Sequence, residues 1–384
     1  MRVNSVIRGA SALCLVWVAA CGGGGENGFV DAGPGGQFSS LGRDAGSDAS
    51  SGWITVGGST EIAPNAASSG QVVVSGGIPF AAFSDESKDG KLTVMQLTGG
   101  KWTTVGSAGF TTDSAYYFTL FVDGTTPYVA YSSYSSGLAV MKYNGSAWVL
   151  VGNAGFATNS GYGLATLAVL NGVVYVAFID SSSRFHVMSF GGSAWADLGG
   201  APVSTYSYYC TMTIFNGAVY VAYNDETASI LYLDMWTGTA WVHVAQSPNT
   251  IDEDWGQILT VSQGALYLIY YNSTYGVIVL KLNGSTLTSV GALGSVTNGD
   301  DVEYVSGTVY NGVPYVAYDD ESRDSDPQPQ AATVKYFDGT SWQLYAGYPN
   351  PCDIEYTYIS ADQTSGKIYL TYSDCNSQMT VQVH

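Results

Sequence analysis

The sequence predicts an all-β fold, a seven-bladed β-propeller in which each blade is a four-stranded antiparallel sheet. Three observations lead to this prediction. A tyrosine-rich motif occurs seven times, a tryptophan-containing motif also occurs seven times, and the two ends of the repeat region are incomplete in complementary ways. Regular self-similarity at a period of roughly 40–50 residues is typical of propeller blades arranged around a central axis.

The tyrosine-rich motif is clearest as Pro-Tyr-Val-Ala-Tyr, which begins at Pro127 and again at Pro314. Looser copies begin at Phe80, Tyr175, Tyr220, Tyr267 and Tyr369. The second motif, Trp-x-x-Val-Gly and its variants, begins at Trp53, Trp102, Trp148, Trp195, Trp241, Leu287 and Trp342. Continuous apolar runs of this kind indicate strands that are buried on both faces. We therefore expect the repeated Tyr and Trp residues to form the core between blades.

Each unit contains four short β-like runs separated by turn signals. In the second unit the runs are 117–122, 128–131, 138–143 and 148–151. Asp-Gly and Asn-Gly pairs favour the positive φ angles of tight hairpins. Such pairs occur at Asp123-Gly124, Asn144-Gly145, Asn171-Gly172, Asn216-Gly217, Asn283-Gly284, Asn311-Gly312 and Asp338-Gly339.

The ends of the repeat region predict how the ring closes. Residues 53–57 match the fourth strand of a unit but have no preceding three strands. The C-terminal runs 355–360, 368–372 and 379–383 form three strands without a fourth. If the N-terminal strand completes the last blade, the ring has seven blades and an exposed sheet edge is covered.

The first 51 residues are predicted to direct export and to tether the folded part. Residues 1–20 carry Arg2 and Arg8 before a short apolar run, which is typical of a signal peptide and too short for a membrane span. The run ends in Val-Ala-Ala-Cys21, which resembles the lipobox of bacterial lipoproteins; the resemblance implies acylation of Cys21 and anchoring at the outer membrane or cell surface. Residues 21–51 are rich in Gly, Ser and Asp, so we expect a flexible linker.

The repeats of residues 52–384 resemble those of bacterial secreted β-propellers that are grouped with the kelch and galactose-oxidase-like propellers. The copies at Pro127 and Pro314 and the segment Lys142–Gly152 carry this resemblance. It implies the fold, but propellers have many unrelated activities and it implies little about function.

Charge limits the classes of partner. Without Arg2 and Arg8, ten basic residues face 31 acidic ones, so the formal charge becomes −21. Nucleic acids and anionic lipid surfaces require basic patches. We therefore expect no nucleic-acid partner, contact with the membrane through the lipid anchor only, and a monomer.

Signatures of enzymatic propellers are incomplete. Residues 338–342 resemble a sialidase Asp box, but the segment is one residue short and lacks the leading serine. The arginines after the signal peptide are only Arg43, Arg184 and Arg323, too few for a sialidase triad outside the linker. A copper site would require histidines at nearby positions of the blades, but His186, His243 and His384 occupy unrelated positions within their repeats. The sequence favours a protein that is not an enzyme; a glycan-acting hydrolase or lyase is a less favoured alternative.

A ring of aromatic residues on one face favours a binding function. Loops between blades and loops after each second strand emerge on the same face, here termed the top face. The candidate ligand-binding residues there are Tyr117, Tyr162, Tyr209, Trp255, Tyr304 and Tyr356. Their rings could stack on a glycan or contact a protein, or they could merely plug the core. Fucose-binding propeller lectins have similar blade lengths but use Arg and Glu on inner strands, which we do not recognise here. A structural or assembly scaffold is the alternative function.

Acidic residues follow the tyrosine motif in five units, at Asp85, Asp180, Asp225, Asp320 and Asp374, with Ser133 and Asn272 in the other two. Such side chains usually accept backbone N–H bonds and fix a turn. The alternative is calcium, which prefers clustered oxygen ligands. The candidate metal ligands are Asp319, Asp320, Asp324 and Asp326. No other cofactor is expected.

Three cysteines remain besides Cys14 and Cys21. Cys210 lies inside a first-strand pattern and should be a small buried residue. Cys352 precedes the first strand of the last unit and Cys375 follows its second strand, so an antiparallel hairpin brings them to the same end. We predict a disulfide between them, because export to an oxidising compartment permits one.

Overall fold

The computed structural model describes residues 52–384, apart from short gaps at 58–61, 63–66, 116, 134–136, 158–165, 250–254, 299–301, 324–330, 350–353 and 375–376. The described strands form seven sheets of four antiparallel strands each, so the predicted fold class is confirmed. The predicted signal peptide, Cys21 and the linker lie outside the described residues.

Six blades are continuous in the chain. Blade 1 contains β2 (Ala67–Ser75), β3 (Ile78–Asp85), β4 (Lys91–Thr98) and β5 (Lys101–Thr104); blade 2 contains β6 (Tyr117–Asp123), β7 (Thr126–Ser133), β8 (Gly137–Tyr143) and β9 (Trp148–Leu150). Blade 3 contains β10 (Thr166–Leu170), β11 (Val173–Ile179), β12 (Phe185–Phe190) and β13 (Trp195–Asp197); blade 4 contains β14 (Cys210–Phe215), β15 (Ala218–Asp225), β16 (Ile230–Trp236) and β17 (Trp241–Gln246).

Blade 5 contains β18 (Trp255–Ser262), β19 (Ala265–Asn272), β20 (Gly276–Asn283) and β21 (Thr286–Ser289); blade 6 contains β22 (Val302–Tyr310), β23 (Val313–Asp320), β24 (Ala331–Phe337) and β25 (Trp342–Leu344). Blade 7 combines β1 (Ile54–Thr55) with β26 (Glu355–Ala361), β27 (Ile368–Ser373) and β28 (Met379–Val383). Two short 3₁₀ turns follow β3 and β23, η1 (Glu86–Lys88) and η2 (Glu321–Arg323). Within the described part of the chain, no helix is both long and apolar enough to span a bilayer.

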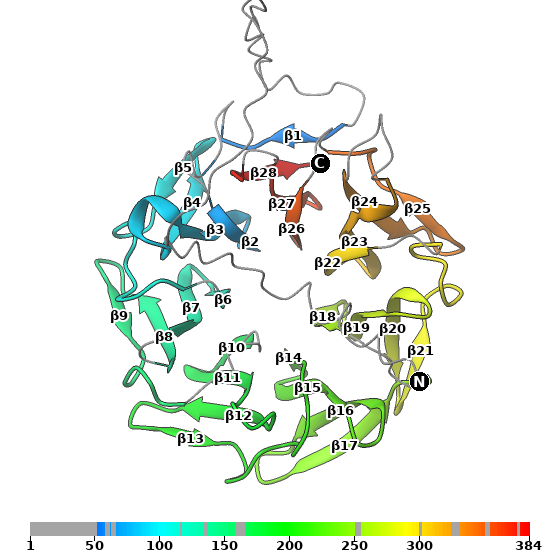
Figure 1. The fold of residues 1–384 in the computed structure, drawn as a ribbon, viewed down its shortest axis with the longest axis horizontal. Coiled ribbons are helices and arrows are strands. Elements are labelled where there is room, and N and C mark those ends of the chain that lie inside the picture. Colours follow the sequence, from blue (N-terminus) through cyan, green and yellow to red (C-terminus); the bar gives the residue numbers. More distant parts are fainter. Residues whose placement is uncertain are drawn as a thin grey trace, which may run out of the picture. The chain divides into compact units, whose positions relative to one another are not determined.

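The ring closes as the sequence predicts. β1 pairs antiparallel with β28, with Ile54 opposite Val383 and Thr55 opposite Gln382. The first strand of each blade lies nearest the axis and the fourth lies outermost, so the blades surround a central space lined by β2, β6, β10, β14, β18, β22 and β26 (Figure 1). The order of strands in every sheet follows the chain except where β1 completes blade 7.

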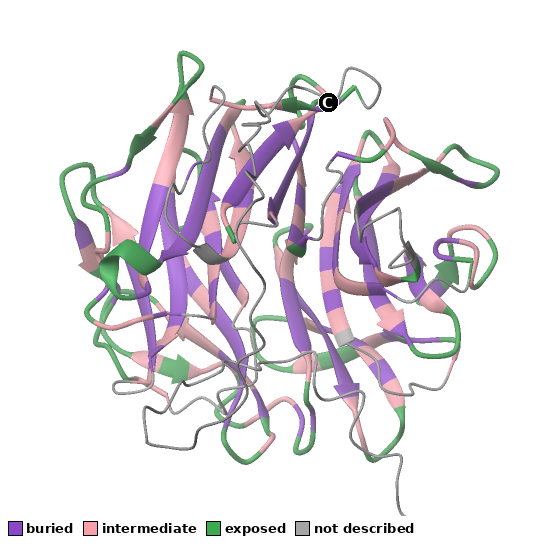
Figure 2. Ribbon diagram, turned by 45° about the horizontal axis from the view of Figure 1, so that its top comes forward, coloured by how far each residue is buried: buried purple, intermediate pink, exposed green. Residues whose placement is uncertain are grey.

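Buried residues follow the strands, and exposed residues lie mainly in the loops at their ends (Figure 2). The second strand of each blade is almost wholly buried. In β23, for example, every residue after Val313 is buried. The residue two positions after the first aromatic residue of the tyrosine motif is completely inaccessible in all seven copies: Ala82, Ala130, Ala177, Ala222, Ile269, Ala317 and Thr371. A small side chain predominates here because neighbouring sheets pack on both faces of the strand.

The predicted hairpin pairs match the structure in part: all seven glycines have positive φ, but of the residues that precede them only Asn171, Asn216 and Asn311 do. Asn171 and Gly172 both have positive φ, 52° and 78°, as do Asn311 and Gly312. Two successive positive φ values are those of a type I′ turn, whose twist suits a two-residue hairpin. The Asn-Gly pairs therefore set the register of the first two strands in these blades.

The tryptophan motif joins neighbouring blades. The indole Nε1 of Trp148 donates a 2.8 Å hydrogen bond to the Val105 carbonyl, and Val105 is the fourth residue of the preceding copy of the motif. Trp195 donates to Val151 in the same way over 3.0 Å. Corresponding bonds link Trp102 to Val56, Trp241 to Leu198, Trp342 to Val290 and Trp53 to Gly347. The motif thus satisfies a buried donor while it locks one blade onto the next.

The glycine of the motif provides room for the next tryptophan. Gly152 has φ 73°, and a Cβ atom there would lie 2.8 Å from Nε1 of Trp195. Two joints depart from this pattern. Between blades 4 and 5, Ala245 replaces the glycine and Leu287 replaces the tryptophan, so the joint loses both members together. Between blades 6 and 7, Ala346, with φ 59°, replaces the glycine, and Trp53 is retained but donates to the next residue, the Gly347 carbonyl.

Candidate functional site

The top face collects most of the predicted aromatic residues at the axis. Tyr117 and Trp255 are the first residues of β6 and β18, and Tyr209 immediately precedes β14. Tyr304 is the third residue of β22, and Tyr356 is the second residue of β26. All five positions are at the same end of innermost strands. Tyr162 lies outside the described residues. The structure therefore places these predicted residues around one opening, but only Tyr304 and Tyr356 have a described ring contact with each other.

Tyr304 and Tyr356 form a pair between blades 6 and 7. Their ring centroids are 4.7 Å apart with planes inclined by 49°. Both residues have positive φ, 48° and 57°, and each lies at a bulge where its strand shifts register against the second strand. Burial raises the pKa of Tyr304, and Tyr356, Glu355 and Glu303 raise it further, so its hydroxyl stays protonated.

Carboxylates surround this pair. Glu303 and Glu355 immediately precede the two tyrosines, and Asp319 on β23 lies opposite Glu303 in the register. Asp319 is 2% exposed. Burial raises its pKa to about 8, and the negative charges of Glu321, Glu303, Glu355 and Asp320 contribute. The site therefore has a strongly negative potential.

Sequence reasoning did not identify Glu303 and Glu355 as site residues. The sequence analysis recognised no glutamate on the inner strands. The structure corrects this, because Glu303 and Glu355 lie at the top-face ends of β22 and β26. The repeated Glu-Tyr pair, 303–304 and 355–356, was the available signal. Among the described innermost strands none contains arginine, so the Arg–Glu combination of the fucose-binding lectins is not reproduced.

A second aromatic site lies on the loop between blades 3 and 4. Tyr206 and Tyr208 are 41% and 46% exposed. Their centroids are 5.4 Å apart with planes inclined by 64°, and their hydroxyl oxygens are 2.7 Å apart. We call this pair the tyrosine platform. Sequence reasoning missed it because both residues lie outside the repeated motifs.

Hydrogen bonds hold the loop that carries the platform. The side-chain oxygen of Asn224 accepts from the Tyr208 and Tyr209 amides over 3.1 and 2.8 Å. The Glu226 amide donates to the Tyr206 carbonyl over 3.2 Å, and the Ser207 amide donates to Ser183 over 2.8 Å.

The polar groups that hold the loop come from the end of β15 and from the second-to-third-strand loops of blades 3 and 4. Asn224 also donates to the Glu226 carboxylate. Burial, followed by the charge of Asp225, raises the pKa of Glu226. The platform is therefore a fixed surface with a carboxylate beside it.

The acidic ring that follows the tyrosine motif fixes turns, as the simpler interpretation predicts. Asp85 accepts from the Ser87 amide over 3.0 Å, and Asp225 accepts from the Thr227 amide over 2.9 Å. Asn272 and Asp374 accept from the amides of Thr274 and Gln378. Among the described residues no group of three or more His, Cys, Asp or Glu side chains is arranged to hold a metal ion. Asp319 and Asp320 are described, whereas Asp324 and Asp326 lie in a gap.

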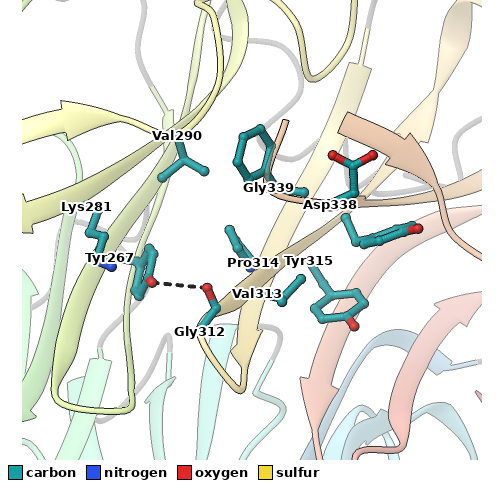
Figure 3. Close-up of a pocket in the computed structure, with 11 residues that line it drawn as sticks. Tyr267, Lys281, Val290, Gly312, Val313, Pro314, Tyr315, Asp338 and Gly339 are labelled. Atoms are coloured by element: carbon teal, nitrogen blue, oxygen red, sulfur yellow. Dashed lines mark hydrogen bonds between the residues drawn. The ribbon is translucent and has the colours of Figure 1, made fainter. Parts of the chain in front are cut away.

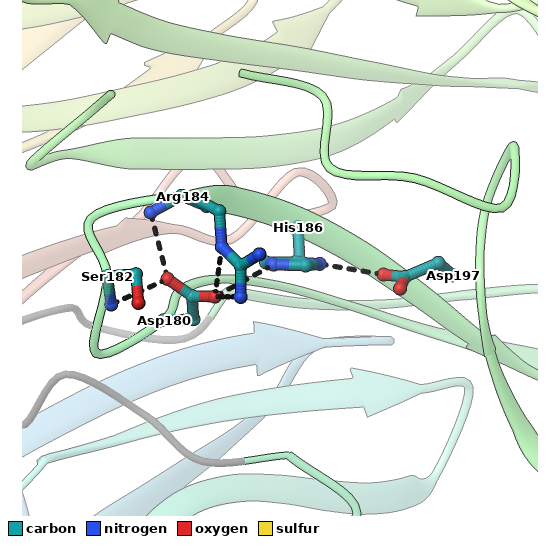
Figure 4. Close-up of polar contacts among 5 residues, drawn as sticks. All are labelled: Asp180, Ser182, Arg184, His186 and Asp197. Carbon is teal, nitrogen blue, oxygen red and sulfur yellow. Dashed lines mark hydrogen bonds and ion pairs between the residues drawn. The ribbon is translucent and has the colours of Figure 1, made fainter. Parts of the chain in front are cut away.

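In blade 3 the residue that follows the tyrosine motif, Asp180, belongs to a larger polar cluster (Figure 4). Asp180 forms a 2.5 Å ion pair with Arg184, and its Oδ1 accepts from the Ser182 and Arg184 amides. His186 bridges Asp180 and Asp197 through its two ring nitrogens, at 3.2 and 2.9 Å. Burial alone would raise the pKa of Asp180, but the hydrogen bonds from Arg184, Ser182 and His186 lower it to about 2. The cluster fastens the outer strands and the top-face loop of this blade together.

An open groove of about 530 Å³ lies on the opposite face, between blades 5 and 6 (Figure 3). The turns at Gly312 and Gly339 border it, and Tyr267 donates a 3.2 Å hydrogen bond to the Gly312 carbonyl across the joint. The Lys281 ammonium lies 5.4 Å from the centroid of the Tyr267 ring. Lys281 is thus already engaged, and the groove has few free polar groups with which to orient a ligand.

The cysteine predictions are tested only in part. Cys210 is buried and forms no disulfide, as expected, and burial raises the pKa of its thiol strongly. Cys352 and Cys375 lie outside the described residues, so their disulfide stays a prediction.

Comparison with known proteins identifies the fold but not a family. No family profile matches the sequence, and no curated protein matches it. Among solved structures, a triple-arginine mutant of AofleA from Arthrobotrys oligospora is 13% identical over 72% of this chain and 84% of its own, with a TM-score of 0.50. A lectin from Aleuria aurantia in complex with Fucα1-6GlcNAc is 13% identical over 76% and 96% of the two chains, with a TM-score of 0.48.

A puromycin-hydrolysing peptidase from Mycobacterium tuberculosis also matches, with 13% identity, 80% of this chain, 51% of the other and a TM-score of 0.50. The solved structures similar to this chain thus include fucose-binding lectins and a peptidase. At this level of identity the likeness shows the propeller alone, and the function has to be argued from the site.

Proposed function

We propose that this protein is a non-enzymatic, lipid-anchored module of the cell envelope that binds glycans on the top face of its propeller. The observation that carries the proposal is the tyrosine platform, in which Tyr206 and Tyr208 are both exposed by more than 40% and are held on a hydrogen-bonded loop. A loop with no binding role would have little reason to expose two large rings in contact.

The platform has the chemistry that sugar recognition requires. A tyrosine ring is flat and apolar with a polar end, so it can cover the C–H face of a pyranose while its hydroxyl accepts or donates a hydrogen bond. The Glu226 carboxylate adds oxygen acceptors for sugar hydroxyls beside the rings, and the Asn224 amide group, which is buried, holds that carboxylate in place. Because Asn224 fixes the loop before a ligand arrives, little conformational entropy is lost on binding.

A glycan array with the purified protein tests the proposal. Exchange of both platform residues, Tyr206→Ala with Tyr208→Ala, should weaken binding of any retained glycan by at least about tenfold. Both rings are largely exposed, so the melting temperature should change little. Leu344→Ala is the matched control, since Leu344 is 41% exposed on the outer strand of blade 6. Retained glycans that bind equally well to the double variant would contradict this site, and a blank array would favour the structural or assembly role.

The anchor is tested separately. If Cys21 is acylated, Cys21→Ser should move the protein from the membrane fraction to the soluble fraction without altering its glycan binding. A Cys21→Ser protein that still sediments with membranes would contradict the lipoprotein proposal.

A further inference from the structure

The upper end of the joint between blades 6 and 7 contains buried polar atoms without partners. Asp319 is 2% exposed and its Oδ1 makes no hydrogen bond; Ser306 is 5% exposed and its Oγ makes none. Nearly all buried polar groups in proteins are hydrogen-bonded. Other buried side-chain atoms of the described residues, such as Thr297 Oγ1 and Gln257 Oε1, also lack partners, but Asp319 Oδ1 and Ser306 Oγ lie on neighbouring strands of one sheet, so this joint is a candidate place for a polar ligand.

Both side chains point toward blade 7. Residues that pair directly in an antiparallel ladder project on the same face, and alternate residues of a strand share a face. Ser306 pairs with Ala317, and Asp319 lies two residues after Ala317 on the same strand. Ala317 packs in one cluster with Ile359 and Leu370 of blade 7. Asp319 and Ser306 therefore face the joint rather than blade 5.

Blade 7 completes the surroundings. Thr357 of β26 donates through its hydroxyl to the Tyr304 carbonyl, which holds the two innermost strands together here. Glu303 pairs with Asp319 and so projects on the same face, and Glu355 contributes a further negative charge from β26. Glu355 is exposed at the top of the axis, whereas Asp319 and Ser306 are buried, so a ligand that enters beside Glu355 reaches them only when the side chains that cover them move.

We propose that Glu303, Ser306, Asp319 and Glu355, together with the rings of Tyr304 and Tyr356, bind the ammonium group of an amino sugar. This inference rests on the proposed function in that the ligand is a glycan, but it concerns a different place from the tyrosine platform. An ammonium group has three N–H donors, which can be shared by Asp319 Oδ1, Ser306 Oγ and a glutamate.

An ammonium group fits these residues better than a metal ion. Tyrosine faces attract organic cations through their quadrupoles. The remainder of an amino sugar would extend into the solvent at the axis, where Tyr304 and Tyr356 are only half-buried.

Titration calorimetry with two trisaccharides tests the inference. A trimer of glucosamine carries free amines, whereas a trimer of N-acetylglucosamine has the same ring skeleton without the charge. We expect the glucosamine trimer to bind at least about tenfold more tightly, because acetylation removes the ammonium group. Asp319→Asn should abolish most of this preference, and Glu355→Gln should weaken it. Asp123→Asn is the control, since Asp123 is an exposed carboxylate at the opposite end of blade 2.

Proton release gives a second measurement. The charged groups near Asp319 are Glu303 of β22, Glu355 of β26, and Asp320 and Glu321, which follow it in the chain. Burial, followed by these charges, raises the pKa of Asp319 to about 8. At pH 7 most Asp319 side chains carry a proton, which a bound cation should displace. Calorimetry in two buffers with different ionisation enthalpies should thus detect proton release by the wild type and none by Asp319→Asn.

The outcomes separate this inference from the proposed function. Equal binding of both trimers, or a glucosamine preference unchanged in Asp319→Asn, would overturn the ammonium site and leave the tyrosine platform untouched. Binding of a lysine peptide without binding of the glucosamine trimer would also overturn it. If Tyr206→Ala with Tyr208→Ala abolishes binding of neutral glycans while the glucosamine preference persists, both sites are supported.

Discussion

Replacement of Gly152 by alanine should weaken the joint between blades 2 and 3. Gly152 has φ 73°, and an added Cβ would lie 2.8 Å from Trp195 Nε1 and 2.8 Å from Phe190 Cε2. The left-handed backbone costs alanine about 1–2 kcal/mol. Overpacking of two rings that cannot easily move adds about 1–3 kcal/mol. The hydrogen bond from Trp195 to the Val151 carbonyl is adjacent and would also be strained.

The expected loss is therefore about 2–4 kcal/mol in the free energy of unfolding, after a few tenths are recovered from the less flexible unfolded chain. For a domain of this size that corresponds to a fall in melting temperature on the order of 3–6 °C. Urea denaturation followed by tryptophan fluorescence, with thermal melts by circular dichroism, measures both quantities.

Gly172→Ala is the matched control. Gly172 has a similar φ of 78°, but an added Cβ there would meet no atom within 4 Å. Its substitution should cost only the backbone term, about 1–2 kcal/mol. Equal destabilisation by the two variants would refute the conclusion that the motif glycine makes room for the tryptophan of the next blade.

Three further predictions concern acid stability, ring closure and the disulfide. In the folded protein the pKa of Asp180 is about 2, below its ordinary value of 3.8. The ionised side chain therefore stabilises the fold by about 2 kcal/mol above pH 4, and this contribution is lost as the pH falls toward 2. Urea titrations between pH 6 and 2 should show that Asp180→Asn lacks this acid-dependent part of the free energy of unfolding. Deletion of residues 52–57 removes β1 and the Trp53 indole, so it should expose the edge of β28 and lower the melting temperature sharply; an unchanged melt would contradict closure by this strand. Mass spectrometry of non-reduced peptides should find Cys352 joined to Cys375, and alkylation of both without reductant would exclude the bridge.

The repeated motifs explain why the propeller architecture could be predicted from the sequence. Each blade is a local unit of four hairpin-connected strands, and the information for its turns lies in adjacent residues such as Asn171 and Gly172. The tryptophan motif extends this information to the neighbouring blade, since the copies at Trp53, Trp102, Trp148 and Trp195 supply both an indole and the carbonyl and glycine that receive the next indole. Blade number and ring closure follow from counting these units.

The binding candidates depended on contacts that the repeats do not encode. The sequence pointed to Tyr304 and Tyr356 through their position, but they lie 52 residues apart, and only the stacking of blades 6 and 7 brings their rings within 4.7 Å. Bulges with positive φ at both residues set which side chains face the joint, and a strand pattern does not specify a bulge. The tyrosine platform was missed for a related reason.

Tyr206 and Tyr208 belong to an inter-blade loop with no counterpart in the other units, and its conformation is fixed by Asn224 and Ser183 from two different blades. The sequence by itself thus determined the repeat unit, the number of blades and the closing strand, because these depend on local strand and turn chemistry, whereas the indole-to-carbonyl bonds between adjacent copies were seen only in the structure. Only the tertiary structure decided where Asp319, Glu303 and Glu355 meet and which tyrosines remain exposed. Those features depend on how separate sheets pack together, and the long-range contacts that set this packing leave no regular pattern in the chain.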